Sequence, residues 1–158
     1  MPDGARPLGG FRSFELPSPL ECIATPGHSD DHHVVWDPAT RTVLGGDLFI
    51  GVKVRISHAS EQPRALVTSL RRIAALGLVR YFDGHKGLIA DPVAALNAKA
   101  DWVEETVARI DALIDDGLDD VTIARRVLGD DRMMRTITAG DYTMANFVRS
   151  VRTTRTSA

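Results

Sequence analysis

Three residues of this chain have side chains and neighbours that suit metal ligands: His28, Asp47 and His85. His28 lies in Thr-Pro-Gly-His-Ser, Asp47 follows two glycines, and His85 lies in Asp-Gly-His-Lys-Gly. Imidazole nitrogen and carboxylate oxygen are the donors that hold zinc and similar divalent ions. A two-metal hydrolytic site needs about five protein ligands, and the sequence offers only these three good candidates. It therefore predicts half of a catalytic metal site.

Short strands and one helix are expected to position these three residues. The strands are predicted at residues 20–24, 33–36, 41–44 and 78–82, with a turn at 37–40 and a helix over 62–76 that Gly77 stops. Strand, helix and strand in this order predict a right-handed crossover in an α/β sheet. Each candidate ligand then follows a strand end, where such sheets gather their ligands.

The pattern from Pro92 onward predicts helices. A continuous apolar seam, at the helical spacing of three and four, ends before Gly117 and consists of Val93, Leu96, Ala100, Val103, Val107, Ile110 and Ile114. The seam suits packing against the chain's own sheet, or a coiled-coil dimer as the alternative. Asp119 or Asp120 is expected to cap a shorter helix through Val127, and Asp141 to cap a last helix.

Composition limits the function classes without choosing one. The chain has 158 residues, a hydrophobic fraction of 44% and a net charge of −2, which argues against a nucleic-acid footprint. Cys22 is the only cysteine, so no intrachain disulfide can form and a cytoplasmic location fits. Its apolar neighbours predict a buried thiol. No apolar run reaches the ~20 residues of a membrane span.

The three motifs together resemble the C-terminal half of the metallo-β-lactamase superfamily. The order Thr-Pro-Gly-His-Ser, Gly-Asp and Gly-His is kept, with nineteen residues from His28 to Asp47 and thirty-eight from Asp47 to His85. Residues 25–32 are similar to the branch of β-lactamase-like protein 2, which carries a winged-helix-like C-terminal extension. Residues 118–152 are its expected counterpart. The expected fold is α/β: the C-terminal half of an αββα sandwich, followed by that extension.

This resemblance implies a role for each candidate residue. His28 completes one metal site, Asp47 bridges both metals, and His85 completes the second. Zinc is the expected cofactor, two per complete site, with manganese or iron as alternatives. The implied nucleophile is a metal-bound hydroxide that cleaves a small-molecule ester, thioester, amide or phosphoester. His32 is expected in a hydrogen-bonding role behind the ligands, and Lys86 either steers an anionic substrate or points into solvent.

The sequence departs from the family in one large respect. The signature His-x-His-x-Asp-His precedes the first motif in the family, and these 158 residues contain no such segment. The cluster Asp30-Asp31-His32-His33 has the wrong spacing and follows His28, so it cannot substitute.

The expected organisation is a flexible leader over 1–18, a half-sandwich over 19–91 and a helical region over 92–158. Three hypotheses for the chain stay open. It supplies half of a hydrolase site that a missing N-terminal half or a complementary chain completes, and it is inactive alone. It is a non-catalytic homodimer or domain-swapped binding module. Or it is a fragment of a longer product.

Overall fold

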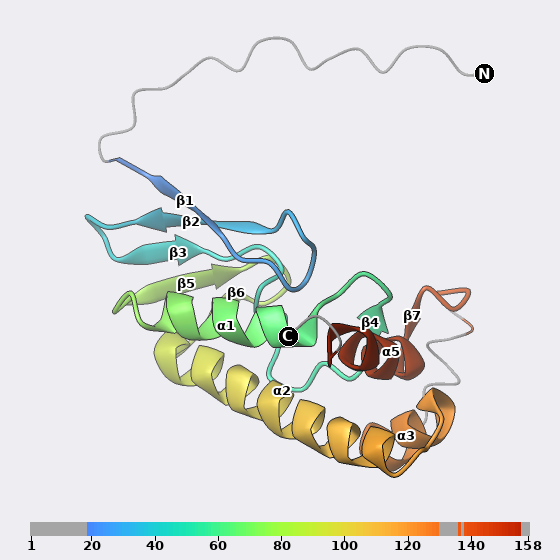
Figure 1. Ribbon diagram of the computed structural model, residues 1–158. Helices are drawn as coiled ribbons and strands as arrows, with labels where there is room; N and C mark the ends of the chain where they lie inside the picture. Colours follow the sequence, from blue (N-terminus) through green and yellow to red (C-terminus); the bar gives the residue numbers. More distant parts are fainter. Residues whose placement is uncertain (1–18, 130–135, 137, 156–158) are drawn as a thin grey trace, which may run out of the picture.

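The computed structural model describes residues 19–129, 136 and 138–155 (Figure 1). The predicted leader over 1–18 lies outside the described residues. The strands are β1 (Glu21–Ala24), β2 (His33–Asp37), β3 (Thr42–Leu44), β4 (Ser57–His58), β5 (Arg80–Asp83), β6 (Gly87–Leu88) and β7 (Tyr142–Thr143). The helices are α1 (Pro63–Ala74), α2 (Pro92–Asp115), α3 (Asp120–Val127) and α5 (Met144–Thr154).

The main sheet has five strands in the order β1-β2-β3-β5-β6. Neighbouring strands are antiparallel except β3 and β5, which run parallel because the chain crosses through α1 between them. The hairpin and the strand–helix–strand unit that the sequence predicts are therefore confirmed, with boundaries shifted by one or two residues.

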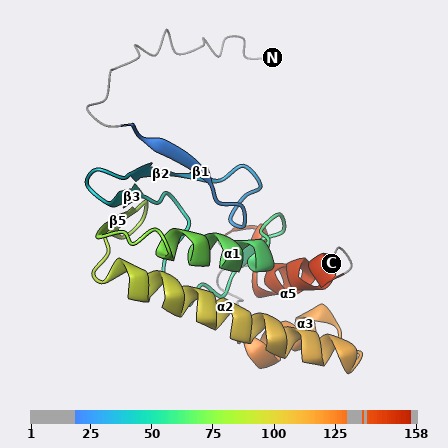
Figure 2. The same ribbon diagram turned by 60° about the vertical axis from the view of Figure 1, so that its left-hand side comes forward.

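Helices α1 and α2 cover one face of this sheet (Figures 1 and 2). Alternate strand residues point toward them, and Val34, Val43 and Tyr81 are fully buried there. The apolar side of α1 meets them through Leu66, Leu70 and Ile73. These side chains form one core, to which the first turns of α2 contribute Leu96 and Ala100.

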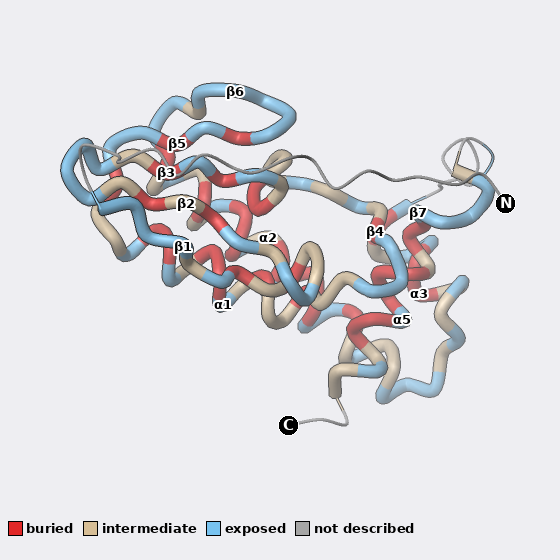
Figure 3. Tube along the Cα trace, turned by 90° about the horizontal axis from the view of Figure 1, so that it is seen from above, coloured by how far each residue is buried: buried red, intermediate tan, exposed pale blue. Residues whose placement is uncertain are grey.

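The opposite face of the sheet carries an apolar row with one residue from each strand. Register pairs Cys22 with Val35, Val35 with Leu44, Leu44 with Phe82, and Phe82 with Leu88. Leu44 is 52% exposed, Phe82 40% and Leu88 60%. We call these five residues the apolar row. The alternation of buried and exposed residues along the strands is visible from above in Figure 3.

The second core lies around the later turns of α2. It joins Val103, Val107 and Ile110 of α2 to side chains of α3 and α5, including Ile123, Phe147 and Val151. The predicted seam of α2 is thus buried within the chain, against α1 and the sheet at one end and against α3 and α5 at the other. No helix within the described ranges is long and apolar enough to cross a membrane.

Three sequence-based expectations are wrong. Cys22 is exposed, because it lies on the face of the edge strand β1 that points away from the helices. The region after Pro92 is not purely helical, since β7 pairs with β4 of the earlier region in a two-stranded sheet.

Helix α5 is capped by Thr143, whose Oγ1 accepts from Asn146 N at 3.0 Å, because the strand β7 places Thr143 directly before it. Asp141 does not hold that position. Asp119 does cap α3 as expected.

Candidate metal centre

The turn after β1 presents His28. Gly27 has φ +142°, and a Cβ there would lie 2.5 Å from Leu66 Cα, so only glycine lets this turn approach α1 so closely. Gln62 N donates to Gly27 O at 2.7 Å, and Ser69 Oγ to Pro26 O at 2.7 Å. These bonds fix the turn to the N-cap and the middle of α1. His28 is consequently held in one place rather than on a free loop, with its side chain 25% exposed.

Asp47 lies between the two candidate histidines. Its Oδ2 is 3.6 Å from His28 Nε2, and its Oδ1 is 3.2 Å from His85 Nε2. Each carboxylate oxygen therefore faces a different imidazole. A carboxylate that bridges two metal ions presents its oxygens in this way, one to each ion.

The loop that carries His85 is tied to the loop that carries Asp47. Gly84 N donates to Gly46 O at 2.8 Å, and a Cβ on Gly84 would lie 2.9 Å from Asp47 Oδ1. Glycine at position 84 is thus what permits the close approach. Buried Asp83 accepts from His85 N at 2.9 Å through Oδ1 and from Ile50 N at 2.8 Å through Oδ2. Its carboxylate joins both loops, a role that the Asp-Gly turn signal at the end of β5 could have suggested.

His32 positions Asp47 through the backbone. Asp47 N donates to His32 Nε2 at 3.2 Å, so in neutral His32 the proton is on Nδ1, which lies 2.7 Å from Thr25 Oγ1. Burial, and then the nearby His28, lower the pKa of His32, which favours this neutral form. His32 thus contacts the chain of Asp47 without being one of the groups that face its carboxylate.

No protein-family model matches the chain. A β-lactamase-like protein 2 homolog of Caenorhabditis elegans is 35% identical over 84 residues, which are 53% of this chain and 27% of that relative. A metallo-β-lactamase family protein of Thermus thermophilus has a similar fold, with a TM-score of 0.60 and 19% identity. That match covers 84% of this chain and 41% of the Thermus chain. Over part of its length, the chain is thus similar to proteins of the metallo-β-lactamase superfamily. It spans about a quarter to two fifths of the length of these relatives.

The donors of this chain fit zinc in type but fall short in number. Asp47 shares each of its oxygens with one histidine, whereas catalytic zinc has three protein ligands. Within the described ranges, no three His, Cys, Asp or Glu side chains converge on one point closely enough to hold a metal ion. The assignment of His28, Asp47 and His85 as ligands stays a prediction, and the arrangement is one that further donors would have to complete.

Lys86 directly follows His85 in the chain. Its backbone N–H donates to Asp83 Oδ1 at 2.8 Å, which places it in the turn after β5, and the residue is exposed. Its proposed action on an anionic substrate stays a prediction. Exposure is compatible with both alternatives that the sequence left open.

Two charged residues that the sequence analysis did not single out lie beside His28. Glu61 Oε1 is 3.7 Å from His28 Nδ1, and burial raises the pKa of Glu61. Lys99, on α2, is 3% exposed and its ammonium donates to Phe49 O. Burial lowers the pKa of Lys99 to about 8, although Glu61 favours the charged form. A signal for Lys99 existed, because it lies between Leu96 and Val103 on the apolar side of α2.

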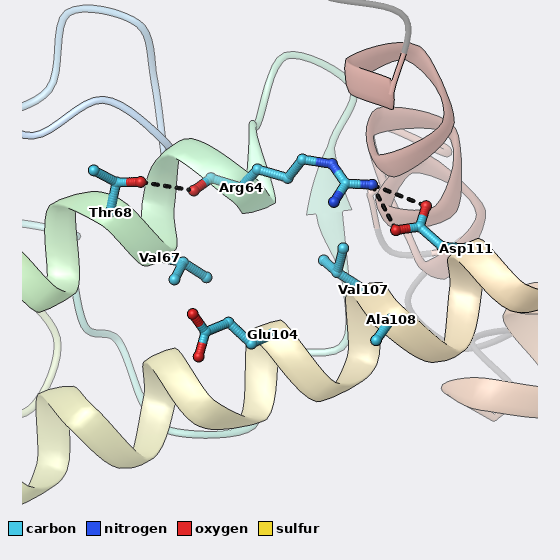
Figure 4. A pocket seen from close by; sticks show the side chains of 7 residues that line it. All are labelled: Arg64, Val67, Thr68, Glu104, Val107, Ala108 and Asp111. Atoms are coloured by element: carbon cyan, nitrogen blue, oxygen red, sulfur yellow. Dashed lines mark hydrogen bonds and ion pairs between the residues drawn. The ribbon is translucent and has the colours of Figure 1, made fainter. Parts of the chain in front are cut away.

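A cavity of about 180 Å³ opens beside His28 and Asp47. Its walls come from the loop before α1, from α2 and from the β7–α5 segment. A larger one, about 340 Å³, lies between α1 and α2, and no candidate ligand lines it (Figure 4). In this larger cavity, Arg64 Nη2 donates to both carboxylate oxygens of Asp111, at 2.8 and 2.7 Å. The charges of these two residues are therefore already paired with each other. The smaller cavity is the one that adjoins the candidate metal ligands His28 and Asp47.

Proposed function

We propose that these residues supply one part of a metal-dependent hydrolase site of the metallo-β-lactamase superfamily. His28 and one oxygen of Asp47 would contribute to one metal position, and His85 and the other oxygen of Asp47 to a second. The observation that carries the proposal is the division of the Asp47 carboxylate between the two imidazoles, at 3.6 and 3.2 Å. Metals bound there would polarise the scissile group and lower the pKa of water.

The remaining ligands would come from a polypeptide segment outside these residues. The apolar row supports this proposal, because a row of exposed Leu44, Phe82 and Leu88 is the kind of surface that another part of a protein covers. The Thermus relative has more than half of its length outside the matched part. The proposed occupant of the row is therefore the other half of the sandwich, as a separate chain or as a covalent segment. Substrate would be an ester, thioester, amide or phosphoester.

The C-terminal region has features that fit the winged-helix-like extension of the β-lactamase-like protein 2 branch. Strand β7 pairs with β4 and leads directly into α5, and α3 packs against α5. We infer that these elements are its counterpart. Their side chains Phe147 and Tyr142 reach the cavity beside His28, so the region also forms part of the site.

The test combines the chain with a polypeptide that carries the N-terminal half of a superfamily relative, including its His-x-His-x-Asp-His segment. The chain alone is expected to bind zinc weakly and to hydrolyse generic esters and thioesters poorly. The mixture is expected to bind two zinc ions per pair and to gain hydrolysis. Metal content by mass spectrometry and initial rates measure both.

Asp47→Asn is the decisive variant of that test. The amide cannot bridge two cations as a carboxylate does, so zinc content and the gained activity should both be lost, while circular dichroism stays unchanged. Asp37→Asn, at the last residue of β2, is the matched control and should keep both. A pair that assembles yet gains neither metal nor hydrolysis contradicts the proposal.

A non-catalytic oligomer is the second candidate, and the same apolar row favours it. Two copies of the chain that cover each other's row would form a stable dimer in solution. Sedimentation equilibrium on the isolated chain separates the two. A dimer that persists in the presence of the complementary half favours the non-catalytic module, whereas a dimer that gives way to the mixed pair favours the hydrolase.

A further inference from the structure

The cavity beside His28 has one polar end and otherwise apolar walls. At the polar end it reaches His28, Asp47 and Glu61, and Lys99 also lines it. The remaining walls are largely apolar, with Val54, Ile56, Leu66, Trp102, Val103 and Phe147. A cavity with largely apolar walls and with its charged side chains beside the candidate ligands can orient a molecule with one apolar and one polar end.

The size of the cavity limits the apolar end. An apolar cavity of about 150 Å³ accommodates benzene, so the 180 Å³ present here accommodates a group of about six carbon atoms. Longer groups would have to extend past the cavity into solvent.

The charges at the polar end limit the other part of the molecule. Glu61 and Asp47 are acidic, and buried Lys99 supplies one positive charge, which leaves no excess positive charge among these side chains for a free carboxylate. The Lys99 ammonium has three donors, of which one is taken by Phe49 O. A neutral carbonyl oxygen can accept from such a donor.

We propose that this cavity is the acyl-binding subsite of the hydrolase, and that it takes a neutral ester, thioester or amide whose acyl or aryl group has about six carbons. This deepens, and rests on, the proposed hydrolase function. The carbonyl would lie at the end where His28 and Asp47 are found, and the apolar group between α2 and α5. Lys99 would orient the carbonyl, and Trp102 and Phe147 would exclude water from the acyl group.

Binding of simple amides to the isolated chain tests the subsite without metal or turnover. Propanamide, butanamide, pentanamide, hexanamide and octanamide share one polar group and differ only in chain length. Each added methylene up to hexanamide should lower Kd by about fourfold, and the gain should stop by octanamide. NMR titration of the ¹⁵N-labelled chain measures Kd and locates the site, since the indole N–H of Trp102 should shift while that of Trp36, in the other core, should not.

Two variants assign the effect to the cavity. Val54→Phe places a larger side chain in a loop wall of the cavity and should abolish the chain-length dependence, while Val79→Phe, at a residue 57% exposed and outside the cavity, should not. Lys99→Met should weaken hexanamide binding about tenfold and keep the chain-length slope. Exposed Lys53→Met is its control. A flat series, shifts located elsewhere, or an unaffected Val54→Phe overturns the proposal.

The subsite and the hydrolase function fail in different ways. If the amide series behaves as expected and the complemented pair gains no hydrolysis, the cavity binds apolar carbonyl compounds and the hydrolase assignment is wrong. If the pair hydrolyses esters with no dependence on acyl length from two to eight carbons, the hydrolase stands and the acyl subsite is wrong.

Discussion

The two faces of the five-stranded sheet differ in what covers them. On the face toward α1 and α2, Val34, Val43 and Tyr81 are fully buried. On the other face, Leu44 and Leu88 are more than half exposed, although they are as apolar as the residues between which they alternate. The row on the open face is therefore as apolar as the covered face, although the next row on the open face is polar, with Asp37, Thr42 and Arg80 paired across the strands. Within the described ranges, only the covered face has helices packed on it.

Adjacent residues of β5 give the sharpest comparison of the two faces. Tyr81→Ala removes a buried ring that packs on Gly45 and should lower the free energy of unfolding by about 3–5 kcal/mol, the range for large aromatic truncations. Phe82→Ala removes a ring that is 40% exposed and should cost below about 1 kcal/mol. Urea denaturation of both variants measures the difference. Equal losses would mean that the open face is covered in solution.

Lys99 is a buried charged residue on the covered side of the sheet, and its effect on the free energy of unfolding depends on pH. Its folded pKa of about 8 is below the ordinary lysine value of 10.5, so between these values the unfolded chain holds more protons and stability rises with pH. Between pH 8 and 9.5 the chain should gain about 1–2 kcal/mol relative to Lys99→Met, since one pKa unit corresponds to about 1.4 kcal/mol. Parallel slopes for the chain and the variant, from urea titrations at each pH, would contradict a buried ammonium.

Leu44→Thr changes the open face alone. The isolated variant should unfold within about 0.5 kcal/mol of the unaltered chain, because Leu44 is 52% exposed and has little contact to lose. Its concentration-dependent association should weaken several-fold, since the row loses an apolar side chain at its centre. Val43→Thr, one residue earlier on β3, is the matched substitution on the covered face and should destabilise without altering association. Sedimentation velocity and urea titration separate the two effects.

Local patterns predicted most of the elements. The apolar seam of α2, the start of α2 at Pro92 and the cap at Asp119 each depend on neighbours within about one turn, and each is where the sequence places it. The predicted N-cap of α5 was wrong because the position of the true cap, Thr143, depends on the pairing of β7 with β4, which lies some eighty residues earlier in the chain. The predicted burial of Cys22 was wrong because the alternation of side chains along β1 defines two faces of the strand but does not show which of them the helices cover.

In the candidate site, too, some features follow from local sequence patterns and others depend on distant segments of the chain. Strand ends predicted that His28, Asp47 and His85 would come together, and the folded chain brings each histidine within 3.6 Å of Asp47. Helical spacing places Lys99 on the apolar side of α2, but its neighbours, like those of Glu61, come from distant segments, as the Lys99 bond to Phe49 O across fifty residues shows. Motifs identified the residues that face one another, while the cavity that adjoins them depends on tertiary packing.

Cys22 offers the least perturbing test of the open face, because it needs no substitution. It is exposed at the end of the apolar row, paired with Val35 on the neighbouring strand. In the isolated chain its thiol should react with a maleimide or a disulfide reagent at a rate within a few-fold of that in the denatured chain, and stability should be unchanged. Binding of the complementary half should slow the reaction strongly, because the row is then covered. A thiol that is already protected in the monomer would show that the two faces are more alike than their exposure indicates.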